Sequence, residues 1–533
     1  MALAAFGWSV TGSFHFDDYS LFSSRAVIAP SGPLQLLGLL QSRPLTYLTF
    51  WANYQAGGAS PLGWHVVNLL LHVASVLLAF ASLRRLIPER AALLAAALFA
   101  VHPLNAEAVN YIFARSTLLC TVLTLASLRS WVNGRHWHAV AWFAPALLAK
   151  EECVTFPLFL LLLNLAARGR SGNEGRTQAK TPAPQRQMNG LQSSSSRPLA
   201  CDDFRHGLLP ATSPSRREWR PIAAMLGLSL LAGVRILVAT FYVPGASAGP
   251  SAGISPFAWL ASEGPAILRY LRLLLIPAGL TVDPDLRVVT NWPAWLAWMA
   301  VLALSAAALR LFSGLRAGFW LLAGLVLLLP SSSVFPAADL AADRRMYLPM
   351  VAFAAGGAML LYSMRTPALV VVCASLAAIS ISRCEVWRTE LSLWTDAVRM
   401  APDKLRPRIQ LARALPPDRA LALLEEAESV APGDPDLPSE RGRIYLQMGD
   451  AAHALSSFGR ALALNPASPL AINNRGAALL ALGQNEAARL DFERALAIDP
   501  CQPNALFNLR QMGIDKPAAR NCPADSAPLT ASP

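Results

Sequence analysis

The chain has 533 residues, of which 54% are hydrophobic and only 15% are charged, and its formal net charge is +12. The length would suit about three or four soluble domains, but charge this scarce argues against a chain made only of soluble domains and indicates a membrane protein. The basic residues lie in loops between apolar runs, which is typical of cytosolic loops rather than of a nucleic-acid surface. We therefore expect a lipid bilayer and no nucleic acid as partner.

An acidic pair stands near the start of the chain, in the stretch SFHFDDYSLF. Asp17 and Asp18 are neighbours among aromatic residues, where each carboxylate opposes ionisation of the other. The simple explanation is a solvated acidic turn, and the alternative is a loop with a chemical role. We assign residues 1–62 to an extracytoplasmic acidic loop region.

Apolar runs long enough to cross about 30 Å of hydrocarbon fill two groups of membrane helices, 63–167 and 221–383. The ten predicted spans are 63–83, 91–103, 116–132, 137–149, 153–167, 221–243, 293–312, 318–330, 347–363 and 367–383. Arginines place alternate loops in the cytosol: Arg84, Arg85, Arg90, Arg129, Arg135, Arg310, Arg316 and Arg365. The other loops then face outward.

Two segments depart from this pattern. The stretch 257–280 is apolar, but Arg269 and Arg272 in its middle would be costly in lipid, so we expect an interfacial or re-entrant helix on the outer face. The stretch 168–220 is basic and rich in Ser, Pro and Gly. It cannot bury enough apolar surface to fold, and we predict a disordered cytosolic linker.

The membrane pattern stops after Arg383, and an internal repeat fills residues 384–516. Prolines and glycines recur there at intervals of 34 residues: Pro432, Pro466 and Pro500; Gly442 and Gly476; Gly449 and Gly483. This is the tetratricopeptide period, in which paired helices meet at small residues and proline ends the second helix. Such a stack presents a concave groove, usually for an extended peptide. We predict that the tail, 517–533, is disordered.

Polar residues gather in the loops predicted to face outward. They are Asp17, Asp18, Arg43, His65, Asn68, His102, Glu107, Arg115, Lys150, Glu151, Asp343, Arg344, Arg345 and Tyr347. Each has a simpler structural explanation, as a polar contact between helices, a helix end or a rim ion pair. Because all of them lie on one side of the predicted topology, a functional site is favoured.

A family resemblance is carried by six motifs: FDDY, RPLTYLTFWANY, GWHVVNLLLH, FAVHPLNAEAVNYIFARSTLL, LLAKE and DRRMYLP. They resemble those of the transmembrane and tetratricopeptide-repeat-containing family, whose members resemble protein O-mannosyltransferases of the C-type membrane glycosyltransferase class. The likeness runs from Phe16 to about Gly513. It implies an all-α fold: a polytopic helical membrane bundle followed by a short tetratricopeptide-repeat α-solenoid. It also implies an extracytoplasmic active site, a polyprenyl-phosphate sugar donor and a protein hydroxyl as acceptor.

The chain departs from the family pattern in two places. The family normally has a spanning helix before its acidic pair, so the first membrane helix is expected to be missing or truncated here. Asp343 stands where glutamate is usual.

The chemistry implied needs a carboxylate to take the acceptor's proton and cations to stabilise the departing phosphate. Adjacent side chains of an extended loop point opposite ways, so one aspartate faces the acceptor and the other positions the loop, with a slight preference for Asp18 as base. The predicted phosphate-binding residues are Arg344, Arg345, Arg43, His102 and Lys150, and the predicted supporting residues are Glu107, Arg115, His65, Asn68 and Tyr347. A single base implies inversion at the anomeric carbon.

Cofactor chemistry stays open at this point. Asp17, Asp18 and Glu107 could supply oxygen ligands to a divalent cation. The sequence contains no P-loop and no GxGxxG after a strand, so no nucleotide-sugar site is expected. The expected donor is the lipid-linked sugar, and a divalent cation stays an open alternative.

The leading hypothesis is a glycosyltransferase that moves a sugar, with mannose first, from polyprenyl phosphate to Ser/Thr hydroxyls of proteins, while the repeats bind acceptor peptide. A related enzyme would modify a glycan or lipid. The alternatives are an inactive membrane-anchored repeat scaffold and a transporter, although a transporter would carry its charges near the midplane. We expect a bacterial inner membrane with site and repeats in the periplasm, or the endoplasmic reticulum membrane in a eukaryote.

Overall fold

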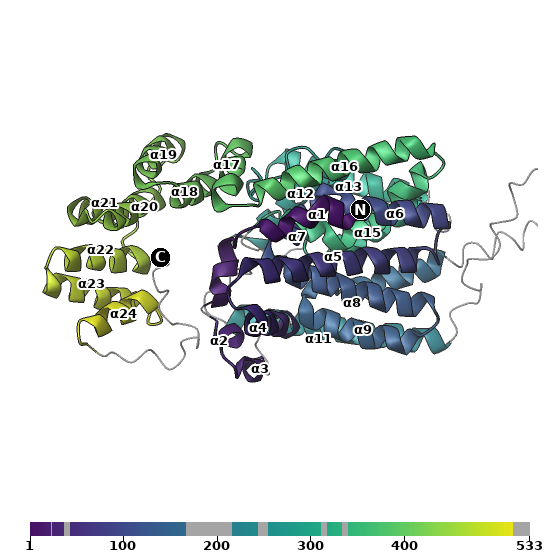
Figure 1. Cartoon of the computed structure of the whole chain (residues 1–533), viewed down its shortest axis with the longest axis horizontal. Coiled ribbons are helices and arrows are strands. Elements are labelled where there is room, and N and C mark those ends of the chain that lie inside the picture. Colours follow the sequence, from purple (N-terminus) through teal and green to yellow (C-terminus); the bar gives the residue numbers. More distant parts are fainter. Residues whose placement is uncertain are drawn as a thin grey trace, which may run out of the picture.

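The computed structural model describes residues 1–22, 24–36, 43–166, 216–242, 254–310, 317–332 and 339–514. Within these ranges the regular secondary structure is entirely helical. Long helices run side by side in one bundle, and an arched stack of shorter helices adjoins one end of it (Figure 1). The predicted fold class, a helical membrane bundle followed by a tetratricopeptide stack, is confirmed.

Helices cover the core of every predicted span. The helices that cover nine of these spans are α5 (Pro61–Leu83), α6 (Glu89–Val101), α8 (Arg115–Val132), α9 (His136–Ala149), α11 (Arg216–Tyr242), α13 (Trp292–Arg310), α14 (Ala317–Leu328), α15 (Tyr347–Leu361) and α16 (Thr366–Val386). The predicted span 153–167 is helical over residues 156–166. The apolar periodicity of the sequence therefore located the bundle helices to within a few residues.

Within the described residues, fewer than the ten predicted spans form a helix long enough to cross a membrane. In the described ranges, five helices are long and apolar enough to cross a membrane, or six if the bent pair Glu89–Val101 and Pro103–Asn110 forms one span. Helices α9, α14 and α15 have 14, 12 and 15 residues, below the roughly 17 that a spanning helix needs. They pack within the bundle without meeting the length requirement of a full span.

Small residues let the bundle helices approach one another closely. Helices α14 and α15 meet where Gly324 lies against Phe353: a Cβ at Gly324 would lie 2.5 Å from that ring. Alanines line the facing surfaces of α6 and α15, with Ala91, Ala95 and Ala355 almost fully buried. Membrane helices associate through close van der Waals packing of this kind.

The N-terminal region is more ordered than the predicted acidic loop region of residues 1–62. It contains α1 (Ala2–Phe6), η1 (Gly7–Thr11), η2 (Phe16–Phe22), α2 (Arg25–Ile28), α3 (Gly32–Gln35) and α4 (Pro44–Gly57). Phe6 is fully buried and meets His72 of α5 edge-on, with ring centroids 5.1 Å apart. The first residues thus pack into the bundle, which buries the apolar side chains of the short helix α1.

Five short elements lie at the end of the bundle that carries η2. They are η3 (Pro103–Asn105), α7 (Ala106–Asn110), η4 (Ile112–Ala114), η5 (Glu151–Cys153) and η7 (Asp343–Met346). At the opposite end the arginine-bearing loops meet one another. Arg129 donates to the carbonyl of Ala81 at 2.7 Å, and Arg90 donates to the carbonyl of Met364 at 2.9 Å. The arginine-bearing loops therefore lie at the opposite end of the bundle from the loops predicted to face outward.

The predicted linker 168–220 lies mostly outside the described residues, but its last five residues, 216–220, belong to α11. The tail 517–533 also lies outside the described residues. The stretch 257–280 forms α12 (Pro256–Leu275) and then non-helical chain, and Arg269 pairs with Asp343 at 2.6 Å instead of facing lipid.

The repeat array consists of antiparallel helices after α17 (Glu390–Met400). They are α18 (Leu405–Ala414), α19 (Pro417–Val430), α20 (Asp436–Gln447), α21 (Ala451–Leu464), α22 (Pro469–Ala481), α23 (Asn485–Ile498) and α24 (Pro503–Gln511). Helices α19, α21 and α23 each end two residues before Pro432, Pro466 and Pro500, as the spacing predicted. Gly449 and Gly483 have φ angles of +79° and +75°, which favour glycine in these turns.

Gly476 provides a test of the repeat packing. A Cβ there would lie 2.7 Å from the buried ring of Phe492, whereas a Cβ at Gly459, inside α21, would meet nothing within 4 Å. We expect Gly476→Ala to lower the free energy of unfolding of the array by about 1–3 kcal/mol through overpacking. The matched Gly459→Ala should raise it by about 0.5–1 kcal/mol. Hydrogen exchange of the α20–α23 amides measures both, and equal effects would contradict this packing.

Candidate active site

The polar residues singled out from the sequence come mostly from elements at one end of the bundle, where α2, α4 and α7 lie toward the repeat array (Figure 1). They come from segments far apart in the chain: η2, the loop around α7 and η4, the start of α4, η5 and η7. Contacts between these segments decide which side chains face one another.

Asp18 is fully buried and acts as an anchor. Its Oδ2 accepts the backbone N–H of His15 at 2.9 Å, and its Oδ1 accepts the backbone N–H of Phe113 at 2.8 Å. Burial raises the pKa of Asp18 to about 7, although these two donors oppose the shift. The carboxyl therefore joins η2 to η4, and its oxygens are directed at protein rather than at solvent.

Asp17 is the exposed member of the pair. Its Oδ2 accepts the hydroxyl of Tyr111 at 2.9 Å. The two aspartates sit in a 3-10 helix, not in the extended loop that the sequence suggested, and they still point to different surroundings. The geometry thus reverses the slight preference for Asp18 as base, because only Asp17 presents a carboxylate to the outside.

Arg344 also lies against Tyr111. Its guanidinium carbon is 5.7 Å from the centroid of the Tyr111 ring, within the range of a cation–π contact. Glu107 accepts the backbone N–H of Arg344 at 3.1 Å and also forms an ion pair with its guanidinium. Asp339 accepts a second guanidinium N–H at 3.3 Å. Tyr111 therefore contacts both a carboxylate and a partly exposed arginine.

Lys150 and Arg43 add two further cations. Lys150 follows the end of α9, donates to Thr117 Oγ1 at 2.7 Å and forms an ion pair with Glu152. Arg43 pairs with Glu151 at 2.8 Å. Burial lowers the pKa of Lys150; Glu152 opposes this shift, while the charges of Arg43 and Arg344 add to it. Each of the three cations has a carboxylate partner.

Two predicted phosphate-binding residues make backbone contacts instead. His102 accepts the N–H of Leu104 at 3.2 Å and donates to the carbonyl of Leu274 at 3.3 Å, so both ring nitrogens are occupied. Arg345 donates to the carbonyl of Asp339 at 2.6 Å and to that of Leu340 at 2.9 Å. Both side chains hold loops in place, and a residue's charge in the sequence could not distinguish this use from phosphate binding.

The predicted supporting residues split into two groups. Arg115 is fully buried and donates to Asn68 Oδ1 at 3.0 Å, and Asn68 donates to the carbonyl of Tyr111 at 3.2 Å. These two residues fix the backbone that carries Tyr111. His65 is buried beside Gly12, and Tyr347 donates to Nδ1 of His72 at 2.7 Å inside the bundle; both support packing further from Asp17.

Sequence reasoning missed Tyr111 and Asp339. Tyr111 stands inside the quoted motif between Glu107 and Arg115, and a polar aromatic residue among these charged groups was the available signal. Asp339 precedes Arg344 by five residues, in a stretch without a distinctive pattern. Neither tertiary contact is visible in local spacing.

A metal centre is not favoured by this arrangement. Within the described residues, no group of three or more His, Cys, Asp and Glu side chains could hold a metal ion. Of the three oxygen donors considered from the sequence, Asp18 accepts two backbone N–H groups and Glu107 accepts Arg344. Only Asp17 has an exposed carboxylate.

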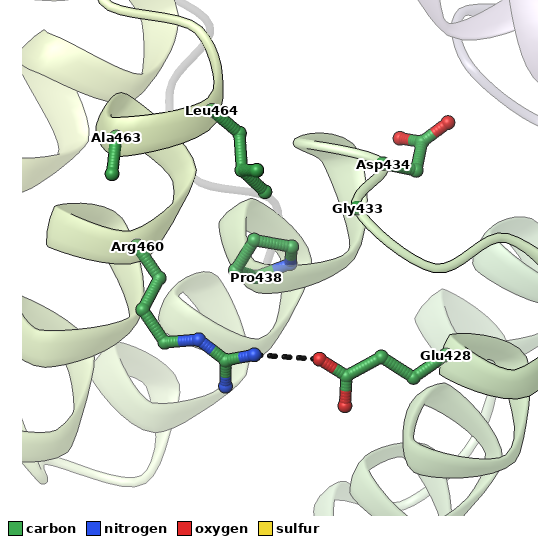
Figure 2. Close-up of a pocket in the computed structure, with 7 residues that line it drawn as sticks. All are labelled: Glu428, Gly433, Asp434, Pro438, Arg460, Ala463 and Leu464. Atoms are coloured by element: carbon green, nitrogen blue, oxygen red, sulfur yellow. Dashed lines mark hydrogen bonds and ion pairs between the residues drawn. The ribbon is translucent and has the colours of Figure 1, made fainter.

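The repeat array carries a pocket of its own, with a volume of about 270 Å³. Figure 2 shows it between the ends of α19 and α21 and the start of α20, with Leu464 and Pro438 forming an apolar side. An ion pair of 2.6 Å between Arg460 and Glu428 closes it below. The pocket could hold a small apolar group beside a charged rim.

Comparison with protein families identifies the repeats of the C-terminal array. The family model described as "Tetratricopeptide repeat" matches residues 440–468 and 470–500. "First TPR of Spaghetti (RPAP3) bound to HSP90 peptide SRMEEVD" is a solved structure that matches 18% of this chain and 77% of its own, with 33% identity and a TM-score of 0.18.

Curated relatives match a larger share of the chain. "Protein O-mannosyl-transferase Tmtc1" of Drosophila melanogaster is 40% identical over 141 residues, 25% of this chain and 16% of the relative. "Protein O-mannosyl-transferase TMTC4" of Homo sapiens is 36% identical over 198 residues, 29% of this chain and 27% of the relative. The match therefore spans only about a sixth to a quarter of these relatives' length. These relatives and the repeat match confirm the resemblance of this multi-pass membrane protein to the transmembrane and tetratricopeptide-repeat-containing family.

Proposed function

We propose that the chain is a membrane glycosyltransferase that transfers a sugar, with mannose as first candidate, from a polyprenyl-phosphate donor to Ser/Thr hydroxyls of proteins. The names of the relatives support the reaction class. The observation that carries the proposal is the contact between exposed Asp17 and the Tyr111 hydroxyl, with Arg344 over the Tyr111 ring. This arrangement sets a proton acceptor beside a set of cations at one end of a membrane bundle.

Asp17 serves as the general base in this proposal. A Ser or Thr hydroxyl is a weak nucleophile, and a carboxylate within hydrogen-bond reach takes its proton as the oxygen attacks the anomeric carbon. The bond from that carbon to the phosphate oxygen breaks, and the phosphate leaves with the bonding electron pair. One displacement inverts the anomeric configuration. The Tyr111 hydroxyl donates to Asp17 and orients its carboxylate.

The departing phosphate gains negative charge, and preorganised cations stabilise such charge most strongly where water is scarce. Arg344 offers a planar guanidinium suited to phosphate oxygens, with Lys150 and Arg43 as further cations. Their carboxylate partners keep the site near neutrality before the donor binds. Phosphate binding then exchanges part of these ion pairs for contacts with the donor.

The repeat array is proposed to hold acceptor polypeptide beside this end of the bundle, because tetratricopeptide stacks offer extended binding surfaces. The relatives named above come from animals, and nothing supports the expected bacterial inner membrane. We propose the endoplasmic reticulum membrane, with the site and the repeats on the luminal side.

The direct test compares three forms of the full chain in membranes supplied with radiolabelled polyprenyl-phosphate-mannose. We expect Asp17→Asn to lower transfer to protein by about 100-fold or more, because the general base is lost. The matched Asp285→Asn removes an exposed outer carboxylate that pairs only weakly, at 3.8 Å, with Arg287, and should leave transfer unchanged. Full transfer by Asp17→Asn would sink the base assignment, and no transfer by the wild type would favour an inactive repeat scaffold.

Asp18 gives a separate prediction about pH. Its pKa of about 7 in the folded state lies above the ordinary value of 3.8, so the folded protein retains a proton that the unfolded chain releases. This contribution to stability is fully present below about pH 4 and is lost as pH rises towards 7. The Tm of the wild type should therefore fall more between these pH values than that of Asp18→Asn. Parallel curves for the two forms would contradict the buried, titrating anchor.

A further inference from the structure

The repeat array is ion-paired to the bundle at a buried aspartate. Asp283 lies in the non-helical chain after α12, and its side chain is 3% exposed. One of its oxygens accepts from Lys404, and the other accepts from Arg406 Nε at 2.7 Å. Lys404 and Arg406 lie at the start of α18. The first helix of the array is therefore fixed to the outer loops of the bundle.

Asp339 connects this junction to the cation set. Its Oδ1 accepts from Arg406 Nη1 at 2.7 Å, and its Oδ2 accepts from Arg344 Nη2 at 3.3 Å. One carboxylate is thus shared by an arginine of the repeat array and the arginine proposed to meet the donor phosphate. The shorter distance belongs to Arg406, so the stronger contact of Asp339 is with the array.

We propose that Asp339 is a positioning residue through which Arg406 of the repeat array sets the availability of Arg344 for the donor phosphate. The proposal rests on the proposed function of the site. While Arg406 holds Asp339, Arg344 keeps only a long contact with that carboxylate. Without Arg406, the whole negative charge of Asp339 attracts Arg344 and competes with phosphate.

Electrostatics at the junction is strong enough for this competition. Asp339 has a side-chain exposure of 25%, as does Arg344, so their attraction is screened less than that of a fully exposed pair. Arg406 and Arg344 both lower the pKa of Asp339, against the effect of its burial. A pocket of about 230 Å³ borders Asp283, Asp339, Lys404 and Arg406, and the Arg406 side chain is 46% exposed. Arg406 therefore has room to leave and return.

Lys404 provides a matched control. Its ammonium group contacts Asp283 and the carbonyl of Pro284, and its ion pair is with Asp283 rather than with Asp339. Lys404→Gln removes one ion pair to Asp283, as Arg406→Gln does, but leaves intact the Asp339 contact that Arg406→Gln also removes. A role limited to docking the array predicts similar effects for the two substitutions.

The test measures binding of polyprenyl phosphate to the full chain in lipid nanodiscs, with polyprenyl alcohol as reference. We expect Arg406→Gln to weaken phosphate binding about fivefold, a size typical of a partly screened charge contact, and Lys404→Gln to leave it within about twofold. The double variant Arg406→Gln/Asp339→Asn should restore wild-type affinity, because the competing carboxylate is gone. Equal weakening by the two single variants, or no restoration in the double variant, would overturn the proposal.

A second readout separates this inference from the proposed function. If the wild type binds the phosphate no better than the alcohol, the proposed donor site fails. Hydrogen exchange of the amides in η7 then tests the link alone, since the Arg344 N–H donates to Glu107. Altered exchange in Arg406→Gln but not in Lys404→Gln supports the coupling, and unchanged exchange in both overturns it.

Discussion

The buried carboxyl of Asp18 is the contact on which the arrangement of the site depends. It joins backbone N–H groups of His15 and Phe113, which are almost 100 residues apart in the chain. A buried carboxyl is costly unless its hydrogen bonds are satisfied, and here both oxygens have donors. Because Asp18 is fixed in this way, its neighbour Asp17 is held at the surface and meets the Tyr111 hydroxyl. Two identical adjacent side chains thus acquire different roles from burial alone.

Each cation of the site forms an ion pair within the protein. Arg344, Lys150 and Arg43 each have a carboxylate partner from another segment or a neighbouring turn. Buried or half-buried charges require such partners, and the pairs also hold the loops that carry them. A phosphate donor would compete for these cations rather than meet free ones. Asp339 pairs with Arg406 of the repeat array as well as with Arg344. Docking of the array therefore affects the same carboxylate that competes with phosphate for Arg344.

The sequence was sufficient for the large elements and insufficient for the assignment of the site. Apolar runs located the bundle helices, and the 34-residue spacing placed the helix ends before Pro432, Pro466 and Pro500, because both patterns are local consequences of packing. The gathering of Asp17, Glu107, Lys150 and Arg344 at one end also followed from charge and topology. Local pattern could not separate Asp17 from Asp18, or Arg344 from Arg345, since neighbours of one type differ only in tertiary contacts. The contact of Tyr111 with Asp17 was missed for the same reason.

The most direct measurement is an experimental structure of the full chain in a lipid nanodisc with bound polyprenyl-phosphate sugar. This account predicts phosphate oxygens within hydrogen-bond distance of the Arg344 guanidinium, and the anomeric carbon on the side of the Asp17 carboxylate. Asp18 should keep its contacts with His15 and Phe113. A donor phosphate bound at the opposite end of the bundle, beside Arg90 and Arg129, would contradict the account.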